Sequence, residues 1–479
     1  MTYETDLARP RATGWAALRP YAATMLVLAG GILLQALNMY VTTSLLPSAV
    51  DDIGGERYYS WVTSIYMVAS IVAAMLVSRC LGLLGGTRAY LLGFATFVAG
   101  SVVCAAAPVM EVLLVGRILQ GLGGGLLSGL AFALIGTVLP AELRARGTGI
   151  VSAMFGVGTL VGPALGGAIS EYGDWRAAFG LVAGLGVVLA ALVPGALRGE
   201  AQPSGHAESV PLASLGLLAA AIAALSVSSV LSNSAAVAAI LVAVLAFAGF
   251  VAWERRASST VLPAATYRLS SPLSWTYLSI GLITGSVASE AFTPLFGQRL
   301  TGMTPLMAGF LGATISAGWS FTGLLSVRAQ RPTTIRTLRL AGPLTVAAGM
   351  VLAALLQADS HSEVRVVAWG VALLLAGAGI GMAFPHAAVA AMSSGGDEAD
   401  AGKAAAGVPM VGLIAQSLVV ALGGVLVNAG LPSVPTAARS LFIALALIAG
   451  LGALVAVRAT RPARIPATSP EPVAAQRST

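Results

Sequence analysis

Charge is what this sequence lacks most. Only 9% of its 479 residues are charged, against about 25% in an average soluble domain, while 57% are hydrophobic. So little charge is typical of a polytopic membrane protein, in which spans of about 20 apolar residues follow one another. The composition therefore places the chain among membrane proteins rather than soluble globular domains.

Cysteine, histidine and lysine are also scarce. The two cysteines, Cys80 and Cys104, are predicted near opposite membrane faces, which argues against a disulfide, and three scattered histidines give no metal cluster. The single lysine, Lys403, stands in GGDEADAGKAAAG, where the glycine spacing is wrong and Ala404 replaces the Ser/Thr of a phosphate-binding loop. No nucleophile–base pair is evident either. We expect no cofactor, no metal and no enzymatic activity.

What the chain has in abundance is long apolar stretches, and these predict fourteen membrane helices. Strands of a membrane barrel would alternate in polarity, and these stretches do not. They lie near residues 22–50, 58–82, 88–108, 110–138, 148–170, 176–197, 212–231, 235–253, 273–297, 304–326, 339–358, 366–392, 404–429 and 438–457. The fold class expected is all-α and polytopic.

The basic residues support this count. With the N-terminus inside and every stretch crossing, twenty of the 26 lysine and arginine residues fall on the inside, as the positive-inside rule requires. Removing one member of the pair within 212–253 would spoil this bias, whereas removing both would keep it, so twelve spans remain an alternative. Topology explains the net charge of +7, and nucleic-acid binding gains no support from it.

The spans group into two blocks of six. We expect a cytoplasmic tail (1–20), a six-helix bundle (21–198), a linker with two extra membrane helices (199–260), a second six-helix bundle (261–458) and a disordered cytoplasmic tail (459–479). Both ends would lie in the cytoplasm, with the bundles in the cell inner membrane. Equal blocks suggest an internal repeat, as in transporters that rock around a central site.

The stretch GVGTLVGPALGG puts poor helix formers inside an apolar segment. Gly158, Gly162 and Gly166 recur every four residues and line one helix face, where the missing side chains let another helix approach closely. Pro163 and Gly167 loosen the backbone further, which suits a helix that bends. A plain packing face is the alternative interpretation.

With the following AISEYGDWRAAFG, this run resembles the fifth-helix antiporter motif of the major facilitator superfamily (GxxxGPxxGG, then W-R-x-x-F). VGRILQGLGGGLLSG resembles the family's fourth-helix motif R-x-x-Q-G, with Arg117, Gln120 and Gly121 at matching positions. LNMYVTTSLLPSAVDDIGG resembles the first-helix motif of the 14-span drug:proton antiporters, although Asn38 replaces the usual aspartate. SRCLGLLGGTRAYLLG resembles the loop motif G-x-L-x-D-R-x-G-R-R, with Gly82 where the acid would be.

This resemblance implies two six-helix bundles around a midplane cavity that opens alternately to each side, and export rather than import. Apolar cavity walls would suit small amphiphilic or cationic compounds, including drugs and natural products. The implied partners are this substrate, protons and the lipid bilayer, and a monomer is expected. The candidate cavity residues are the polar side chains Gln35, Asn38, Tyr40, Thr42, Thr43, Gln120 and Gln416.

Glu290, in TGSVASEAFTPLF, is the only acid away from the ends of a predicted span and is the candidate proton carrier. Arg117 has a similar depth, since both lie on the order of 9 Å outward from their span centres at 1.5 Å rise per residue, which allows a contact between the bundles. An intramembrane arginine usually faces a cavity or a partner. His386, in MAFPHAAVAAM, is the second titratable candidate. The alternatives are a fixed ion pair or an acid facing outside water for Glu290, a structural tie to backbone carbonyls for Arg117, and a structural role for His386.

Three other functions stay open. A proton-independent facilitator, or a lipid or glycolipid exporter of the same fold, would need no acid in the first helix. A receptor that binds ligand without transport is a third, although no sizeable soluble signalling domain is evident.

Overall fold

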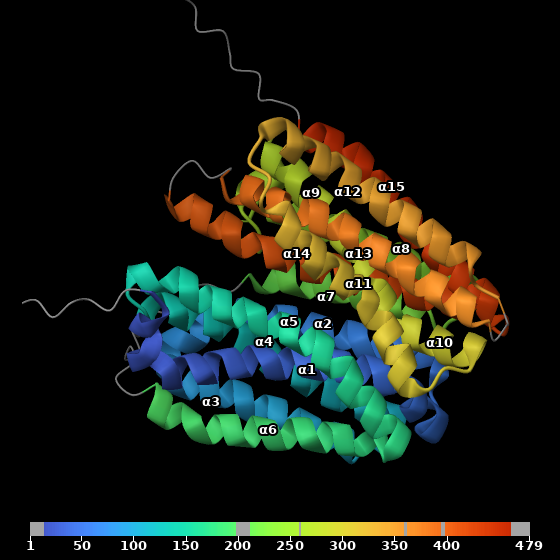
Figure 1. Cartoon of the computed structure of the whole chain (residues 1–479), viewed down its shortest axis with the longest axis horizontal. Coiled ribbons are helices and arrows are strands. Elements are labelled where there is room, and N and C mark those ends of the chain that lie inside the picture. Colours follow the sequence, from blue (N-terminus) through green and yellow to red (C-terminus); the bar gives the residue numbers. More distant parts are fainter. Residues whose placement is uncertain (1–13, 198–210, 258–259, 359–361, 394–397, 461–479) are drawn as a thin grey trace, which may run out of the picture.

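The computed structural model of the chain describes residues 14–197, 211–257, 260–358, 362–393 and 398–460, all of them in helices and their connections. The chain folds into two helical bundles lying side by side, drawn below and above in Figure 1. The predicted tails and the first part of the 199–260 linker lie largely outside the described residues. Within the described part no strand occurs, so the all-α expectation is confirmed.

The first bundle contains six helices, preceded by a short 3-10 helix, η1 (Gly14–Tyr21). The helices are α1 (Ala22–Ile53), α2 (Tyr59–Met75), α3 (Val77–Ala105), α4 (Met110–Val138), α5 (Ala141–Tyr172) and α6 (Trp175–Ala196). The turn expected between 82 and 88 is a kink at Gly85, whose φ of 74° is the left-handed conformation that glycine adopts most easily.

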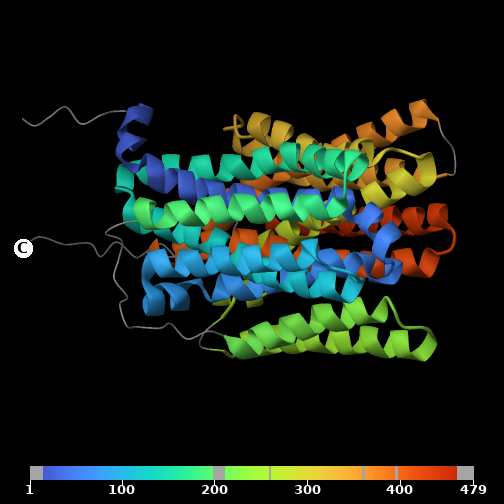
Figure 2. The same cartoon turned by 90° about the horizontal axis from the view of Figure 1, so that it is seen from below.

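Two further helices, α7 (Leu212–Ser228) and α8 (Asn233–Glu254), form an antiparallel hairpin on one side of the molecule (Figure 2). Its α7 packs against α2 of the first bundle and α14 of the second. Trp61 of α2 donates its indole N–H to the Ser226 carbonyl of α7 at 2.8 Å. The hairpin thus contacts both bundles.

The second bundle follows a 3-10 turn, η3 (Ala264–Tyr267). Its elements are α9 (Pro272–Thr284), the 3-10 helix η4 (Gly285–Ala291), α10 (Thr293–Thr301), α11 (Pro305–Ser326), α12 (Pro332–Leu355), α13 (Glu363–Met392), α14 (Glu398–Gly430) and α15 (Val434–Ala459).

The stretch expected as one helix at 273–297 is instead helical in three pieces, α9, η4 and α10. Two hydroxyls near the break bond to backbone carbonyls, Thr284 to Ile280 at 2.8 Å and Ser286 to Ile283 at 2.5 Å, and such bonds compete with a regular helix. Pro294, at the start of α10, supplies no backbone N–H. The local sequence therefore breaks the helix within the apolar segment.

Eleven helices among the described residues are long and apolar enough to cross a membrane. The protein is therefore a multi-pass membrane protein. The 17-residue α7 is shorter than this criterion allows, and neither α11 nor the broken α9–η4–α10 segment is among the eleven. The count of fourteen spans remains a prediction.

Buried apolar side chains show where the bundles meet. One cluster joins both bundles, for example Leu45 of α1 with Phe292 and Phe296. It lies toward the distal end of the molecule, the end that carries the turns 54–58, 106–109 and 173–174. At the opposite end, the terminal end, where η1 begins and α15 ends (Figure 2), the first bundle has a core of its own. A third cluster unites the second bundle, the hairpin and Ile71 of α2. The apolar cluster that joins the two bundles without the hairpin is therefore distal.

Candidate functional site

The glycine face of α5 packs directly on α1. A Cβ atom added at Gly162 would lie 2.5 Å from the Cβ of Tyr40, closer than real Cβ atoms approach. Gly158 and Gly166 face α1 equally tightly. The contacts pair Gly158 with Ala36, Gly162 with Tyr40, and Gly166 with Ser44 and Val41. The two helices can touch along this line only because α5 has no side chains there.

The same part of α5 also meets the second bundle. A Cβ at Gly167 would collide with the backbone of Leu306 in α11, and one at Gly309 would lie 2.8 Å from the Ser44 Cβ and 3.1 Å from the Pro163 carbonyl. Pro163 and Gly167 therefore lie at the seam between the bundles. The predicted motif contributes both to packing inside the first bundle and to its contact with the second.

Arg117 is buried in the first bundle with 1% of its surface exposed. Its Nε donates to the Val62 carbonyl at 3.0 Å, and its Nη1 donates to Gln120 Oε1 at 2.9 Å and to Thr42 Oγ1 at 3.3 Å. The guanidinium also lies 4.2 Å from the centre of the Tyr66 ring. Uncharged oxygens and an aromatic face thus surround this cation, and within the described residues it forms no ion pair.

Gln120 extends the network to α1 and α3. Its Nε2 donates to Asn38 Oδ1 and to Ser101 Oγ, each at 2.9 Å. The Asn38 Nδ2 is buried without a hydrogen-bond partner. The asparagine at the usual aspartate position therefore takes part in a buried hydrogen-bond network as an acceptor, and its side-chain NH2 group stays unused.

Five of the predicted cavity residues fall into two groups, while Tyr40 lies apart from both, beside Glu290. Asn38, Thr42 and Gln120 are buried inside the first bundle, and the half-buried Gln35 lies beside Tyr66 at the edge of their network. Gln416 is half-buried on α14 of the second bundle and does not belong to that network.

Glu290 lies in η4, in the break of the α9–α10 segment, with 4% of its surface exposed. One carboxyl oxygen, Oε1, accepts a hydrogen bond from the Ser316 hydroxyl of α11. The other, Oε2, is buried without a partner. Tyr40 of the first bundle reaches this place, and its side chain lies beside Glu290, Ser316 and Thr159. The acid is therefore at the interface of the two bundles.

The structure does not join Arg117 to Glu290, because α1 separates them. Thr42 bonds to Arg117 on one side of α1. Tyr40, two residues earlier and so about 200° around the helix axis, faces Glu290 on the other side. The two charged groups thus contact opposite faces of the same helix.

His386 lies elsewhere. It is buried in α13, and its Nε2 is 3.1 Å from the Ser326 carbonyl at the end of α11. This contact is internal to the second bundle, and the structure does not bring His386 together with Glu290 or Arg117. Cys80 and Cys104 are free thiols. The described residues contain no group of metal-ligating side chains.

A set of polar contacts that sequence reasoning missed connects the bundles at the distal end. Arg299 of α10 pairs with Asp51 of α1 at 2.7 Å and lies 3.9 Å from Glu56. Asn428 of α14 donates to the Arg57 carbonyl at 2.9 Å. We call these contacts the distal latch. No motif pairs residues 51 and 299, which lie 248 positions apart.

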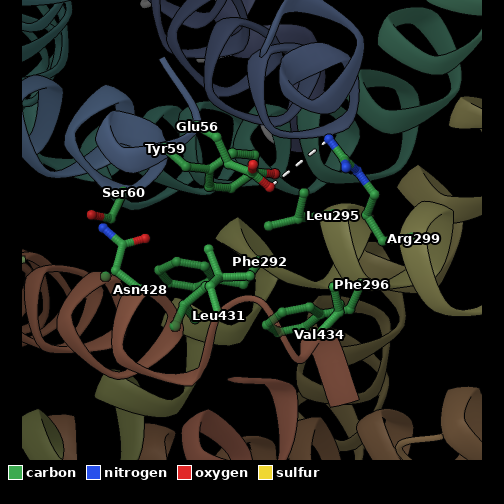
Figure 3. Close-up of a pocket in the computed structure, with 12 residues that line it drawn as sticks. Glu56, Tyr59, Ser60, Phe292, Leu295, Phe296, Arg299, Asn428, Leu431 and Val434 are labelled. Carbon is green, nitrogen blue, oxygen red and sulfur yellow. Dashed lines mark ion pairs between the residues drawn. The ribbon is translucent and has the colours of Figure 1, made fainter. Parts of the chain in front are cut away.

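Figure 3 shows the small pocket beneath the latch, with Glu56 and Arg299 on either side of it. Phe292 and Phe296 form its apolar wall from the second bundle. The hydroxyls of Tyr59 and Ser60 are buried without partners, and both residues line the pocket. The distal interface is therefore closed by an ion pair over an apolar core.

Removing the latch is expected to have a modest effect. Arg299 and Asp51 are 38% and 60% exposed, and an exposed ion pair contributes at most about 1 kcal/mol. Arg299→Gln should therefore shift the balance toward a distally open state by no more than roughly five-fold, and high salt should mimic the change.

The measurement is the distance distribution between spin labels at Glu111 and Val364, exposed positions at the distal ends of the two bundles, in a cysteine-free background. Arg439→Gln is the control, because Arg439 bonds to the Gln357 carbonyl within the second bundle. An identical distribution in wild type and Arg299→Gln would show that the latch is energetically neutral.

Comparison with known proteins identifies the family. The model of the Major Facilitator Superfamily matches residues 28–405. The chain belongs to this superfamily. The resemblance found in the sequence motifs is thereby confirmed, and the protein is a member of a family of transporters, not of enzymes.

Two relatives illustrate the similarity. A protein of Mycobacterium tuberculosis named "Probable multidrug-efflux transporter" is 42% identical over 457 residues, which cover 94% of this chain and 97% of the relative. The multidrug transporter protein MdtP of Bacillus subtilis is 22% identical over 369 residues, 75% of this chain and 67% of the relative.

Solved structures share the major facilitator fold at low identity. A bacterial homolog of the human lysosomal transporter Spinster superposes with a TM-score of 0.64 at 17% identity, covering 92% of this chain and 97% of that one. A POT family transporter bound to 5-aminolevulinic acid gives a TM-score of 0.67 at 16% identity, covering 94% and 97%. These similarities establish the fold.

Proposed function

We propose that this major facilitator exports amphiphilic drugs or natural products across the cytoplasmic membrane in exchange for protons. The two bundles, within 21–198 and 261–458, would rock around a central site, joined by the linker at 199–260. The name of the 42% identical relative supports drug export. The glycine–proline motif of α5 at the bundle seam supports the antiporter mechanism.

The observation that carries proton coupling is the position of Glu290. A coupling group has to bind and release a proton, and its surroundings have to change when the bundles move. Glu290 is a buried carboxyl group that has one free oxygen and touches side chains of both bundles. Glu254, the other buried acid in the described residues, accepts hydrogen bonds from Ser214, Tyr267 and the Val261 amide, all near the hairpin. Glu254 is thus already occupied as a structural group.

The proposal includes fourteen spans with both ends in the cytoplasm. Since α8 is long enough to cross, its antiparallel partner α7 would cross as well, and 17 residues reach about 26 Å at 1.5 Å per residue. The broken α9–η4–α10 segment and α11 would complete the count. With this orientation the distal end faces outward, and the described conformation is closed to the outside.

Energetically, exchange for one proton is sufficient. A proton moving down a membrane potential of 100 mV supplies about 2.3 kcal/mol, enough for roughly a 50-fold gradient of a neutral compound. No ATP-binding motif is required.

The test is uptake of a fluorescent amphiphilic cation into inverted membrane vesicles that contain the wild-type protein. An acidic vesicle interior should drive accumulation at least several-fold above that in vesicles without the protein, and a protonophore should abolish it. Uptake that does not depend on the pH gradient and continues in the presence of the protonophore would favour a facilitator. If the dye is not taken up, but a lipid is moved across the membrane without a pH gradient, a lipid exporter would be favoured.

A further inference from the structure

Tyr40 contributes the part of α1 that reaches the second bundle. Its ring is held from one side by α5, because Gly162 leaves room for its Cβ and Phe155 packs against the ring edge-on, with centroids 6.2 Å apart. The residue is 5% exposed. A rigid side chain in a tight slot has little freedom to point elsewhere.

The Tyr40 side chain lies beside Glu290, and one oxygen of the carboxyl group can still accept a hydrogen bond. Ser316 already occupies Oε1, while Oε2 has no hydrogen-bond partner. Ser316 belongs to the same bundle as Glu290, so it would travel with the acid when the bundles rock. Tyr40 belongs to the other bundle, so it would not move together with Glu290.

Charged groups near Glu290 offer no competing explanation. Among the described residues, Tyr40 is the titratable side chain that interacts with this carboxyl. The helices packed on η4 are α9, α10, α11, α14 and α15. Of these, α11 contains no charged residue, and α14 contains none from Ala404 to Gly430.

The other ionisable side chains that the structure describes on these helices are engaged elsewhere. Their recorded contacts are Tyr277 of α9 with the Ala404 carbonyl, Arg299 of α10 with Asp51 and Glu56, Arg439 of α15 with the Gln357 carbonyl, and Arg458 of α15 with the Trp275 ring. Arg117 contacts only the first bundle. Tyr40 is therefore the main polar group near the Glu290 carboxyl whose position would change between the distally closed and the distally open state.

We propose that Tyr40 is a positioning residue that makes Glu290 release its proton when the bundles are closed at the distal end. When Glu290 ionises in this state, the tyrosine hydroxyl turns to donate a hydrogen bond to Oε2, which has no partner in the described structure, and stabilises the carboxylate. The proton passes to water at the terminal end. Tyr40 keeps its own proton throughout. This inference rests on the proposed function, in which Glu290 carries the coupled proton.

The direction agrees with proton-driven export. Rocking to the distally open state moves α1 away from η4, and Glu290 then loses the donor that favours its ionised form. The acid takes up a proton from the outside and gives it up inside. Gly162 acts on the same step, because it lets Tyr40 sit deep enough to reach the carboxyl.

The test is infrared titration of the Glu290 carboxyl in purified full-length protein in lipid nanodiscs. The C=O band of the protonated acid is assigned by its loss in Glu290→Gln. Tyr40→Phe keeps the ring and its contact with Gly162 while removing only the hydroxyl. Its midpoint should move to higher pH by about one unit, since a hydrogen bond to a charged group is lost. Tyr90→Phe is the control, because the Tyr90 hydroxyl contacts only the Val27 and Leu28 carbonyls.

Transport should follow the same shift. The pH at which uptake is half-maximal should rise in Tyr40→Phe and stay unchanged in Tyr90→Phe. If Glu290 titrates normally but its midpoint is the same in wild type and Tyr40→Phe, the role of Tyr40 is refuted while proton carriage by Glu290 stands. If no Glu290 band titrates between about pH 4 and pH 10, the proposal that Glu290 carries the proton is refuted, and the role of Tyr40 is refuted with it.

Discussion

Replacing Glu290 by glutamine is expected to abolish the response of transport to a pH gradient. Glutamine has nearly the same shape and keeps an oxygen that can accept the hydrogen bond from the Ser316 hydroxyl. It cannot exchange a proton. A gradient of one pH unit, worth about 1.4 kcal/mol or a factor of ten in wild type, should therefore change dye uptake by the variant by a factor close to one.

Two controls make this result specific. Glu290→Asp keeps an ionisable group and should retain part of the gradient response. Glu254→Gln alters an equally buried acid, which accepts from Ser214, Tyr267 and Val261. It should lower stability by about 1–3 kcal/mol, since the amide cannot accept from all three donors, yet leave the gradient response intact. A normal gradient response in Glu290→Gln would move the coupling site elsewhere, with His386 the next candidate.

Replacing Gly162 by leucine is expected to abolish transport while leaving membrane insertion intact. A Cβ alone would lie 2.5 Å from the Tyr40 Cβ, and leucine adds three further carbons. Overpacking of this kind costs about 1–3 kcal/mol and displaces backbone, so α5 and α1 have to separate. Tyr40 then leaves its place beside Glu290. Insertion should persist because leucine favours the bilayer.

The matched control is Gly156→Leu on the same helix. A Cβ at Gly156 meets no atom within 4 Å, so leucine there should extend into open space and transport should stay near wild type. Uptake is measured per amount of monodisperse protein, determined by fluorescence-detected size-exclusion chromatography. Full activity of Gly162→Leu at normal protein levels would show that close packing of α5 on α1 is not required.

Local sequence determined the helical architecture. Runs of apolar residues with almost no charge can only be helices in lipid, and every predicted stretch is helical over most of its length in the described residues. The four-residue spacing of Gly158, Gly162 and Gly166 indicated a face for close packing, since this periodicity is a local property of one helix. Glu290 stood out from local sequence too, because it was the single acid away from the ends of a predicted span.

Tertiary structure decided which of these faces and groups meet. Arg117 bonds within its own bundle, to Thr42 of α1 among others. Tyr40, on the opposite face of α1, lies beside Glu290 of the second bundle. Asp51 and Arg299 form an ion pair across 248 positions of sequence. Helical periodicity fixes which residues share a face of one helix. The rotation and depth of each helix against a distant one depend on the packing of the whole bundle, and that information is spread over all the side chains in contact.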